Sequence, residues 1–341
     1  MLLSAMLLAL VSAALAAQLP APARLMVEHN PAPPRGALLV VSTLRPRFAF
    51  VPHARHEHPG AGVAMSAYRL VVSGPGGEAG WDSGIVNASA AVGIVCGADL
   101  KSMTSYTWTA QWWAAGSAAP SPTSSASFDI GPTNAADWHD TQWVGEGQNE
   151  FRFQFAAGAA SKVFVAAPGG SVVTANGHAV SDECGLSAWI DMNANLPYSG
   201  YDLAPFLDDT AHPGAATQTV VVKIGSGFYS GSRWRPNPAG GEGASGGGTV
   251  STSAVRLLLV DSHGAPAKAV LTGRVGAAIS VDPFTGGIFD DTLADGAGWE
   301  TTKPVSDLKK ARLDGPLRAF ALPPAETAPA AAAGAISTEE S

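Results

Sequence analysis

The sequence is poor in charged residues and has no basic excess. Lys, Arg, Asp and Glu make up 14% of its 341 residues, well below the ~25% of an average globular domain. The 20 Lys and Arg residues are outnumbered by 28 Asp and Glu, which gives a net charge of -8. Nucleic-acid binding needs a basic surface that neutralises phosphates. The composition therefore argues against a nucleic-acid partner.

Cysteine is also scarce, with Cys96 and Cys184 as the two thiols of the chain. They fall in what we interpret below as different domains. A disulfide between them stays open, but two buried free thiols are the preferred interpretation. We therefore expect hydrophobic cores, rather than disulfides, to stabilise the fold.

Long apolar runs are missing after the first 17 residues. Residues 1–17 are uncharged and rich in Leu and Ala, and Ala14 and Ala16 are small residues at the two positions a signal peptidase inspects. We predict a cleaved signal peptide over residues 1–16, and a secreted, extracellular protein with no membrane attachment after cleavage. The alternative, an uncleaved anchor, is short for a span of ~20 residues. Asn87 opens an Asn-Ala-Ser sequon and is the predicted glycosylation site.

Turn-forming residues are abundant instead. The chain has 39 glycines and 25 prolines, against roughly 24 and 17 expected from average usage. Its hydrophobic fraction of 46% is ample for packed cores. This combination favours many short strands joined by turns over a helix-rich enzyme. We predict an all-β fold of two tandem β-sandwiches, the first fibronectin III- or immunoglobulin-like and the second jelly-roll-like and lectin-like.

Alternating patterns locate the strands of both units. In the first unit, Tyr106, Trp108, Ala110 and Trp112 share one predicted strand face. The predicted organisation is an immunoglobulin-like domain over residues 24–131, a linker over 132–136, a second β-sandwich over 137–325 and a disordered tail over 326–341.

In the second unit, Phe151, Phe153 and Phe155 alternate with polar residues, and Asn176-Gly177 predicts a two-residue type I′ hairpin. The apolar runs 220–224 and 255–260 predict strands buried on both faces. Three further elements are expected: a strand over 268–271, a mobile glycine-rich loop over 236–249 and about two helical turns over 306–312.

The first unit resembles the immunoglobulin-like domain that opens many bacterial-type α-L-rhamnosidases. The matching pieces, in the family's order and spacing, are Arg45-Pro46-Arg47-Phe48, Ala67-Tyr68-Arg69-Leu70, Trp81-Asp82-Ser83-Gly84 and the run 100–108. The second unit resembles the β-sandwich that follows in those enzymes. Its matching pieces are Asp137-Trp138 with Trp143-Val144, Asn176-Gly177, Tyr201-Asp202-Leu203 and the glycine–aromatic turn 225–231. The stretch 293–297 departs from the family's pattern.

The resemblance implies a role without catalysis. Enzymes of this family carry their acid and base carboxylates on a helical barrel, and after Pro324 this sequence has an Ala-rich tail. We therefore expect no catalytic residues, no metal and no cofactor. The expected role is that of a carbohydrate-binding or supporting module in plant- or algal-type polysaccharide processing, with a rhamnose-containing glycan as partner. Two alternatives stay open: the N-terminal fragment of a full α-L-rhamnosidase, and an adhesion module that binds a protein partner.

Several residue groups in the sequence resemble catalytic, metal-binding or sugar-binding sites. Three acidic pairs, Asp182-Glu183, Asp208-Asp209 and Asp290-Asp291, are interpreted as turn residues, since adjacent carboxylates on a strand point to opposite faces. The histidine-rich run 53–58 is interpreted as a polar loop rather than a metal site. Sugars stack their apolar faces on aromatic rings. The predicted carbohydrate contacts are therefore Trp189, Tyr229 and Trp234.

Overall fold

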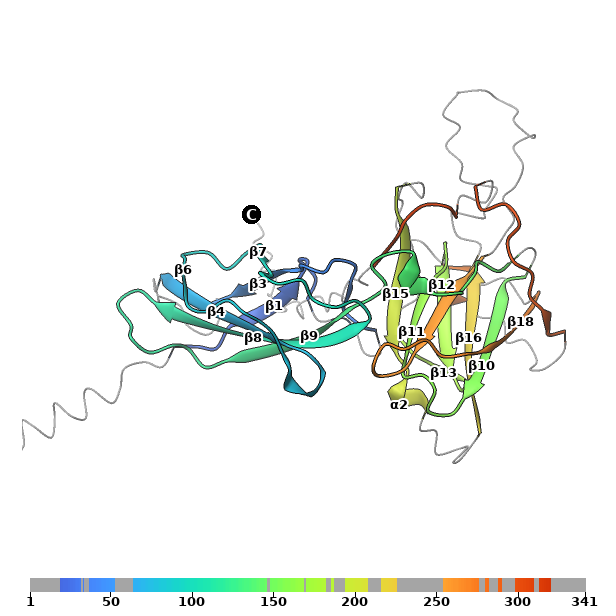
Figure 1. Ribbon diagram of the computed structural model, residues 1–341, viewed down its shortest axis with the longest axis horizontal. Helices are drawn as coiled ribbons and strands as arrows, with labels where there is room; N and C mark the ends of the chain where they lie inside the picture. The colour runs from blue at the N-terminus through green and yellow to red at the C-terminus, as the bar shows by residue number, and fades with distance from the viewer. Residues whose placement is uncertain are drawn as a thin grey trace, which may run out of the picture.

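The computed structural model shows two β-sandwiches side by side (Figure 1). It describes residues 19–31, 33, 37–52, 64–145, 148–168, 170–181, 185–186, 194–207, 216–225, 254–275, 280–281, 288–289, 298–309 and 313–319. Strands β1 to β9 pair among themselves, and the strands from β10 onward pair among themselves. The all-β prediction is confirmed. The domain ends proposed at 131 and 137 stay predictions.

The first sandwich consists of a three-stranded and a six-stranded sheet. The smaller sheet has the order β1 (Ala23–Val27), β3 (Arg47–Val51), β7 (Ile94–Val95). The larger has the order β2 (Val40–Val41), β9 (Ser124–Ile130), β8 (Thr104–Ala114), β4 (Met65–Ser73), β5 (Ala79–Asp82), and β6 (Val86–Asn87) also pairs with β4. A short 3₁₀ turn, Pro75–Gly77, connects β4 to β5.

The aromatic face of β8 forms the centre of the first core, as predicted. Tyr106, Trp108, Ala110 and Trp112 are buried, and the Trp108 ring lies 4.8 Å from the ring of Phe48. Cys96 is a buried free thiol in the same core, while Cys184 lies outside the described residues. A core with this much aromatic area is stabilised mainly by apolar burial.

The Trp81-Asp82-Ser83-Gly84 motif begins in a strand and ends beyond it. Trp81 and Asp82 end β5, and the turn begins at Ser83. The Asp82 carboxylate accepts hydrogen bonds from Arg69, and the Ser83 hydroxyl accepts one from the backbone N–H of Leu70, 2.9 Å away. The motif therefore ties the edge strand β5 to β4.

The second sandwich packs a seven-stranded sheet against a four-stranded one. The larger sheet has the order β13 (His178–Ala179), β12 (Gly170–Ala175), β16 (Thr217–Gly225), β10 (Glu150–Ala156), β18 (Val270–Arg274), β21 (Glu300–Thr301), and β14 (Gly185–Leu186) also pairs with β12. The smaller has the order β17 (Arg256–Val260), β11 (Lys162–Ala166), β15 (Leu196–Asp202), β22 (Leu317–Ala319). The helix α2 (Ala204–Leu207) follows β15, the 3₁₀ turn Ala136–Trp138 precedes β10, and β19 (Ser280–Val281) pairs with β20 (Ile288–Phe289).

Most strand predictions for this unit are confirmed. Phe151, Phe153 and Phe155 are buried on one face of β10, and Asn176 and Gly177 adopt φ angles of 48° and 85°, as a type I′ turn requires. Strand β17 is buried on both faces, because Leu257 and Leu259 enter one core and Leu258 and Val260 enter another.

Three details of the prediction are wrong. Strand β16 is buried on one face only, since Val221 and Lys223 are partly exposed on the other. Strand β18 begins at Val270 rather than at Lys268, because residues 261–269 first turn back along β17. The described part of the predicted helix, residues 306–309, forms a bend and a turn, and its exposed residues bury no apolar face that would stabilise a helix.

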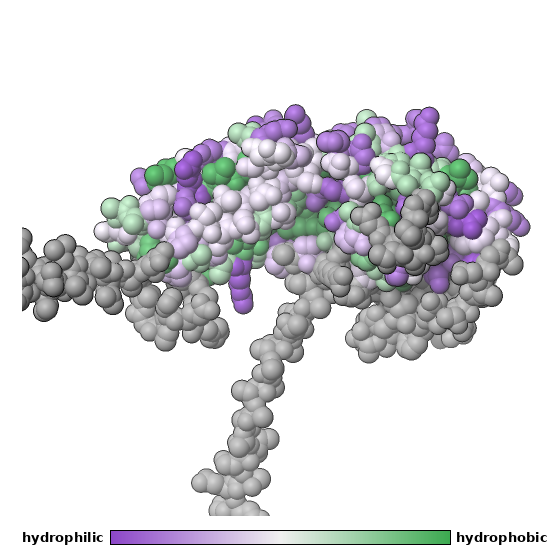
Figure 2. All heavy atoms as spheres, turned by 90° about the horizontal axis from the view of Figure 1, so that it is seen from below, coloured by the Kyte–Doolittle hydropathy of each residue, from purple (hydrophilic) through white to green (hydrophobic). Residues whose placement is uncertain are grey.

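A third apolar cluster joins the two sandwiches. Val40 of the first sandwich packs with Phe164 and Leu258 of the second, and the Tyr198 hydroxyl donates a hydrogen bond to the carbonyl of Pro132, 2.8 Å away. Lys162 forms an ion pair with Asp129 across the same junction, and both side chains are largely buried. Figure 2 shows apolar atoms at the seam between the two halves. The sandwiches therefore dock through a packed interface rather than a free linker.

Across the described residues, no helix is long and apolar enough to cross a membrane.

Candidate functional site

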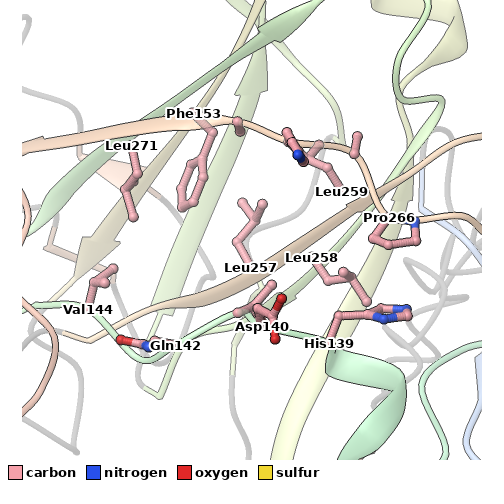
Figure 3. Close-up of a pocket in the computed structure, with 14 residues that line it drawn as sticks. His139, Asp140, Gln142, Val144, Phe153, Leu257, Leu258, Leu259, Pro266 and Leu271 are labelled. Carbon is pink, nitrogen blue, oxygen red and sulfur yellow. The ribbon is translucent and has the colours of Figure 1, made fainter.

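A cavity of about 590 Å³ opens at one edge of the second sandwich (Figure 3). It lies where the chain crosses from β17 in the smaller sheet to β18 in the larger. The polar side chains of His139, Asp140 and Gln142 lie along one side, and Phe153 and Leu271 lie opposite them. A volume of this size is in the range of small-molecule sites.

The crossover that shapes the cavity is held by a tight turn. The Asp261 carboxylate accepts backbone hydrogen bonds from His263 at 2.8 Å and from Ala265 at 2.9 Å. The bond from Ala265 contributes most to lowering the pKa of the Asp261 carboxyl. The chain then returns along β17, where the N–H of Ala267 bonds to the carbonyl of Leu259. Residues 266–269 thereby form one wall of the cavity.

The opposite wall comes from the segment that enters the second sandwich. Its end is fixed by two hydrogen bonds of 2.9 Å between the backbones of Val144 and Val255. Its beginning is fixed by the buried Trp138, and the guanidinium of Arg256 lies 5.2 Å from the centre of the Trp138 ring. Burial lowers the pKa of the Arg256 guanidinium.

His139 holds an unusual backbone conformation at the rim. Its φ is 49° and its ψ is -143°, a region that non-glycine residues rarely adopt. Such strain is often found at functional positions, where the surrounding structure holds it. Here the N–H of His139 bonds to the carbonyl of Ala136, and the Thr141 hydroxyl bonds to the carbonyl of Trp138. The conformation turns the polar run 139–142 along the cavity.

The lining combines an apolar interior with a polar rim of balanced charge. Val144, Phe153, Leu257, Leu259 and Leu271 belong to or pack against the core of the sandwich. Among the described lining residues, Asp140 supplies a carboxylate and Lys268 an ammonium group. This chemistry suits a neutral ligand with one apolar side and several hydroxyl groups.

The predicted carbohydrate contacts are not tested by the structure. Trp189, Tyr229 and Trp234 lie outside the described residues, as do the three acidic pairs and the histidine run 53–58. Tyr198 and Tyr201 of β15 are buried packing residues. Asn87 is exposed at the end of β6. Within the described ranges, no group of three or more His, Cys, Asp or Glu is placed to hold a metal ion.

Sequence reasoning missed the polar rim. The run His139-Asp140-Thr141-Gln142 lies between Trp138 and Trp143, which served above only as matching pieces of the family resemblance. The two tryptophans are buried and anchor the ends of the run. A polar tetrapeptide between two large apolar residues, with no period-two alternation, is the signal that indicates an anchored loop.

Comparison with known proteins gives one family match and several similar folds. Residues 22–134 match the family model described as a Rha78A-like, N-terminal immunoglobulin domain. The α-L-rhamnosidase from Aspergillus terreus superimposes with a TM-score of 0.63 at 17% identity, over 88% of this chain and 35% of that one. The α-L-rhamnosidase from Dictyoglumus thermophilum gives 0.61 at 18% identity, over 89% and 35%.

The chain thus spans about a third of the length of these two enzymes. At 17% and 18% sequence identity, the structural similarity to these enzymes shows only that the folds are alike. No curated protein sequence matches.

Proposed function

We propose that this chain, whose residues 22–134 carry the Rha78A-like immunoglobulin domain, is a non-catalytic module that binds a rhamnose-containing glycan through its second sandwich. The observation that carries the proposal is the cavity at the β17–β18 crossover, with its apolar interior and its rim of His139, Asp140 and Gln142. Rhamnose is a neutral 6-deoxy sugar, so its methyl group suits the apolar interior and its hydroxyls suit the rim.

The lining of the cavity supports a binding role over a catalytic one. Hydrolysis of a glycoside by two carboxyl groups places them ~5–5.5 Å or ~6.5–9.5 Å apart. Among the described residues that line the cavity, Asp140 alone carries a carboxylate.

Isothermal titration with methyl α-L-rhamnoside and longer rhamnosides tests the binding. We expect saturable binding to the wild type and at least a tenfold weaker affinity for Asp140→Asn and Gln142→Ala. Asp140→Asn removes the charge and one acceptor oxygen of the carboxylate, and Gln142→Ala removes the side-chain amide. The control is Asp314→Asn, which changes an exposed carboxylate that does not line the cavity. Equal affinities of the wild type and the three variants would show that the rhamnoside does not bind in the cavity.

An activity assay tests the non-catalytic part of the proposal. The purified chain is incubated with a chromogenic α-L-rhamnoside, and we expect no release of the chromophore above a buffer blank. Release that scales with protein concentration would favour the alternative of a hydrolase. A reproducible protein partner in a pull-down, together with no glycan binder on an array, would favour an adhesion module instead.

Secretion and glycosylation belong to the same proposal. The predicted signal peptide over residues 1–16 would bring Asn87 into the secretory pathway, and its side chain is exposed. Expression in a glycosylating host is expected to give a product whose mass falls after enzymatic deglycosylation. The Asn87→Gln variant is expected to show no such mass difference.

A further inference from the structure

The outward face of the seven-stranded sheet carries a group of charged residues that the cavity does not use. On β10 the phenylalanines point into the core, so Glu150 and Arg152 project to the other side. Lys223 on β16 and Arg274 on β18 lie directly across from Glu150 in the strand register. The described residues of this face thus bring three cations around one carboxylate, in a chain whose net charge is -8.

Glu150 forms an ion pair with Arg274 of the neighbouring strand β18. Its Oε2 atom lies 2.6 Å from Nε of Arg274, and the two side chains retain 5% and 7% of their exposure. A buried pair of this kind is held firmly, because removing either partner leaves an uncompensated charge. The carboxylate is therefore not a ready partner for Arg152.

Trp299 packs against both arginines. The guanidinium carbon of Arg152 lies 4.4 Å from the centre of the Trp299 ring, and that of Arg274 lies 4.5 Å from it. Stacking on the ring fixes the plane of the Arg152 guanidinium while leaving its N–H groups at the edge of that plane. The side chain is thereby preorganised with little remaining rotamer freedom.

Arg152 keeps unused donors. Its Nε donates a hydrogen bond to the hydroxyl of Thr272, 3.3 Å away. Within the part of the chain that the structure describes, its two terminal nitrogens donate to no acceptor, and it forms no ion pair. The residue is only partly buried, so these donors are accessible. A fixed, half-buried guanidinium with a free edge matches the two oxygens of a carboxylate.

We propose that this face binds the carboxylate of an acidic glycan, a uronate residue, with Arg152 as the residue that holds the carboxylate through its two terminal nitrogens. The neighbouring side chains of Gln154, Thr272 and Thr301 offer amide and hydroxyl groups for the sugar ring. Since Arg274 is paired with Glu150, the positive charge that would hold the anion is that of Arg152. The site lies on the opposite side of the sheet from the cavity-lining Phe153, so it is independent of the proposed rhamnoside site.

Titration with trigalacturonic acid at low salt tests the proposal. We expect saturable binding that weakens as salt is added and is lost when the carboxylates of the probe are methyl-esterified. Arg152→Gln is expected to raise the Kd about tenfold or more, because a charge-assisted pair is lost. Arg152→Lys keeps the positive charge but lacks the two terminal nitrogens of the guanidinium. Its Kd is expected to lie between those of the wild type and Arg152→Gln.

Matched controls separate this site from other effects. Arg318→Gln removes an exposed arginine from β22 of the same sandwich, and we expect its Kd to equal that of the wild type. Rhamnoside binding at the cavity is expected to be unchanged in Arg152→Gln. The proposal would be overturned if the wild type and both Arg152 variants bound the probe with equal affinity, or if the wild type bound the methyl ester as tightly as the acid. Tighter binding of a sulfated trisaccharide that contains no uronate would also overturn it.

Discussion

Gly264 occupies a position that only glycine fits. Its φ is +82°, and a Cβ atom there would lie 2.2 Å from the carbonyl oxygen of Met103 in the other sandwich. The obstacle is backbone rather than a flexible side chain, so it has little room to move. At Gly264, the backbone of the turn between β17 and β18 therefore packs directly against the backbone of Met103 in the first sandwich.

The variant Gly264→Ala is expected to be destabilised by about 2–5 kcal/mol. A left-handed conformation costs a non-glycine residue roughly 1–2 kcal/mol, and overpacking costs roughly 1–3 kcal/mol more. Urea unfolding measures the difference. Gly158→Ala is the control, because Gly158 has a φ of +76° with open space around it. Equal losses in the two variants would contradict the close approach.

The pKa of the Asp82 carboxyl is expected to lie well below that of an ordinary aspartate. Hydrogen bonds from Arg69 are the largest cause, followed by the N–H of Gly84, and together they lower the pKa of Asp82 from 3.8 to about 2. Because the pKa in the folded state lies below that in the unfolded state, the pair stabilises the fold above about pH 4. This contribution is lost as the pH falls towards 2.

An NMR titration of the Asp82 carboxyl carbon measures that pKa directly. In the wild type the midpoint is expected near 2, and in Arg69→Gln it is expected to rise towards 3.8 because the main donor is gone. Arg45→Gln, which removes an exposed ion pair with Asp99 elsewhere in the first sandwich, serves as the control. A midpoint unchanged by Arg69→Gln would show that the pair does not set the pKa.

Strand β10 is the element that connects core, cavity and charged face. It is bonded to β16 on one side and β18 on the other. Its phenylalanines fill the core, Phe153 also lines the cavity, and Arg152 projects outward. Because side chains alternate along a strand, a single strand supplies both proposed sites from its two faces.

The variant Phe151→Ala is expected to lose about 3–5 kcal/mol of stability, as large-to-small changes of buried aromatics do. Phe151 is fully buried, whereas Gln154 on the other face is partly exposed. Gln154→Ala is therefore expected to stay within about 0.5 kcal/mol of the wild type. Urea unfolding of the two variants decides the point, and similar losses would contradict the assignment of faces.

Alternation made β8 and β10 predictable from sequence, because one buried face leaves a period of two in the chain. The same rule misjudged β16, where Val221 is apolar but faces outward. The predicted helix over 306–312 rested on local propensity, and its described part has no apolar stripe packed on a core. The cavity was not predictable, since only the fold brings its lining together: residues 139–142, 144, 153, 257–259, 266–269 and 271.

The two sandwiches form a docked pair. One segment joins them: Val40 and Val41 pair with β9 of the first sandwich, while the N–H of Leu38 bonds to the carbonyl of Gly200 in the second. The buried pair of Lys162 and Asp129 lies at the same junction, and Lys162 also bonds to Ser105. We infer that the spacing between the two sandwiches is fixed by this packing.

The variant Lys162→Met is expected to be destabilised by about 3–5 kcal/mol, because Asp129 is left buried without its cation. The double variant Lys162→Met/Asp129→Leu is expected to recover much of that loss, since neither charge remains. Lys303→Met, at an exposed position, is the control in urea unfolding. A double variant no more stable than the single one would show that the ion pair does not control the junction.

The position of a bound rhamnoside tests the central claim most directly. Methyl α-L-rhamnoside is titrated into the isotope-labelled chain, and backbone amide NMR signals are followed to saturation. We predict saturable shifts in residues 139–142 and 267–269, which lie in the two walls of the cavity. Signals of the first sandwich far from the junction are expected to stay in place. Saturable shifts confined to other surfaces, or no shifts at millimolar sugar, would contradict the account.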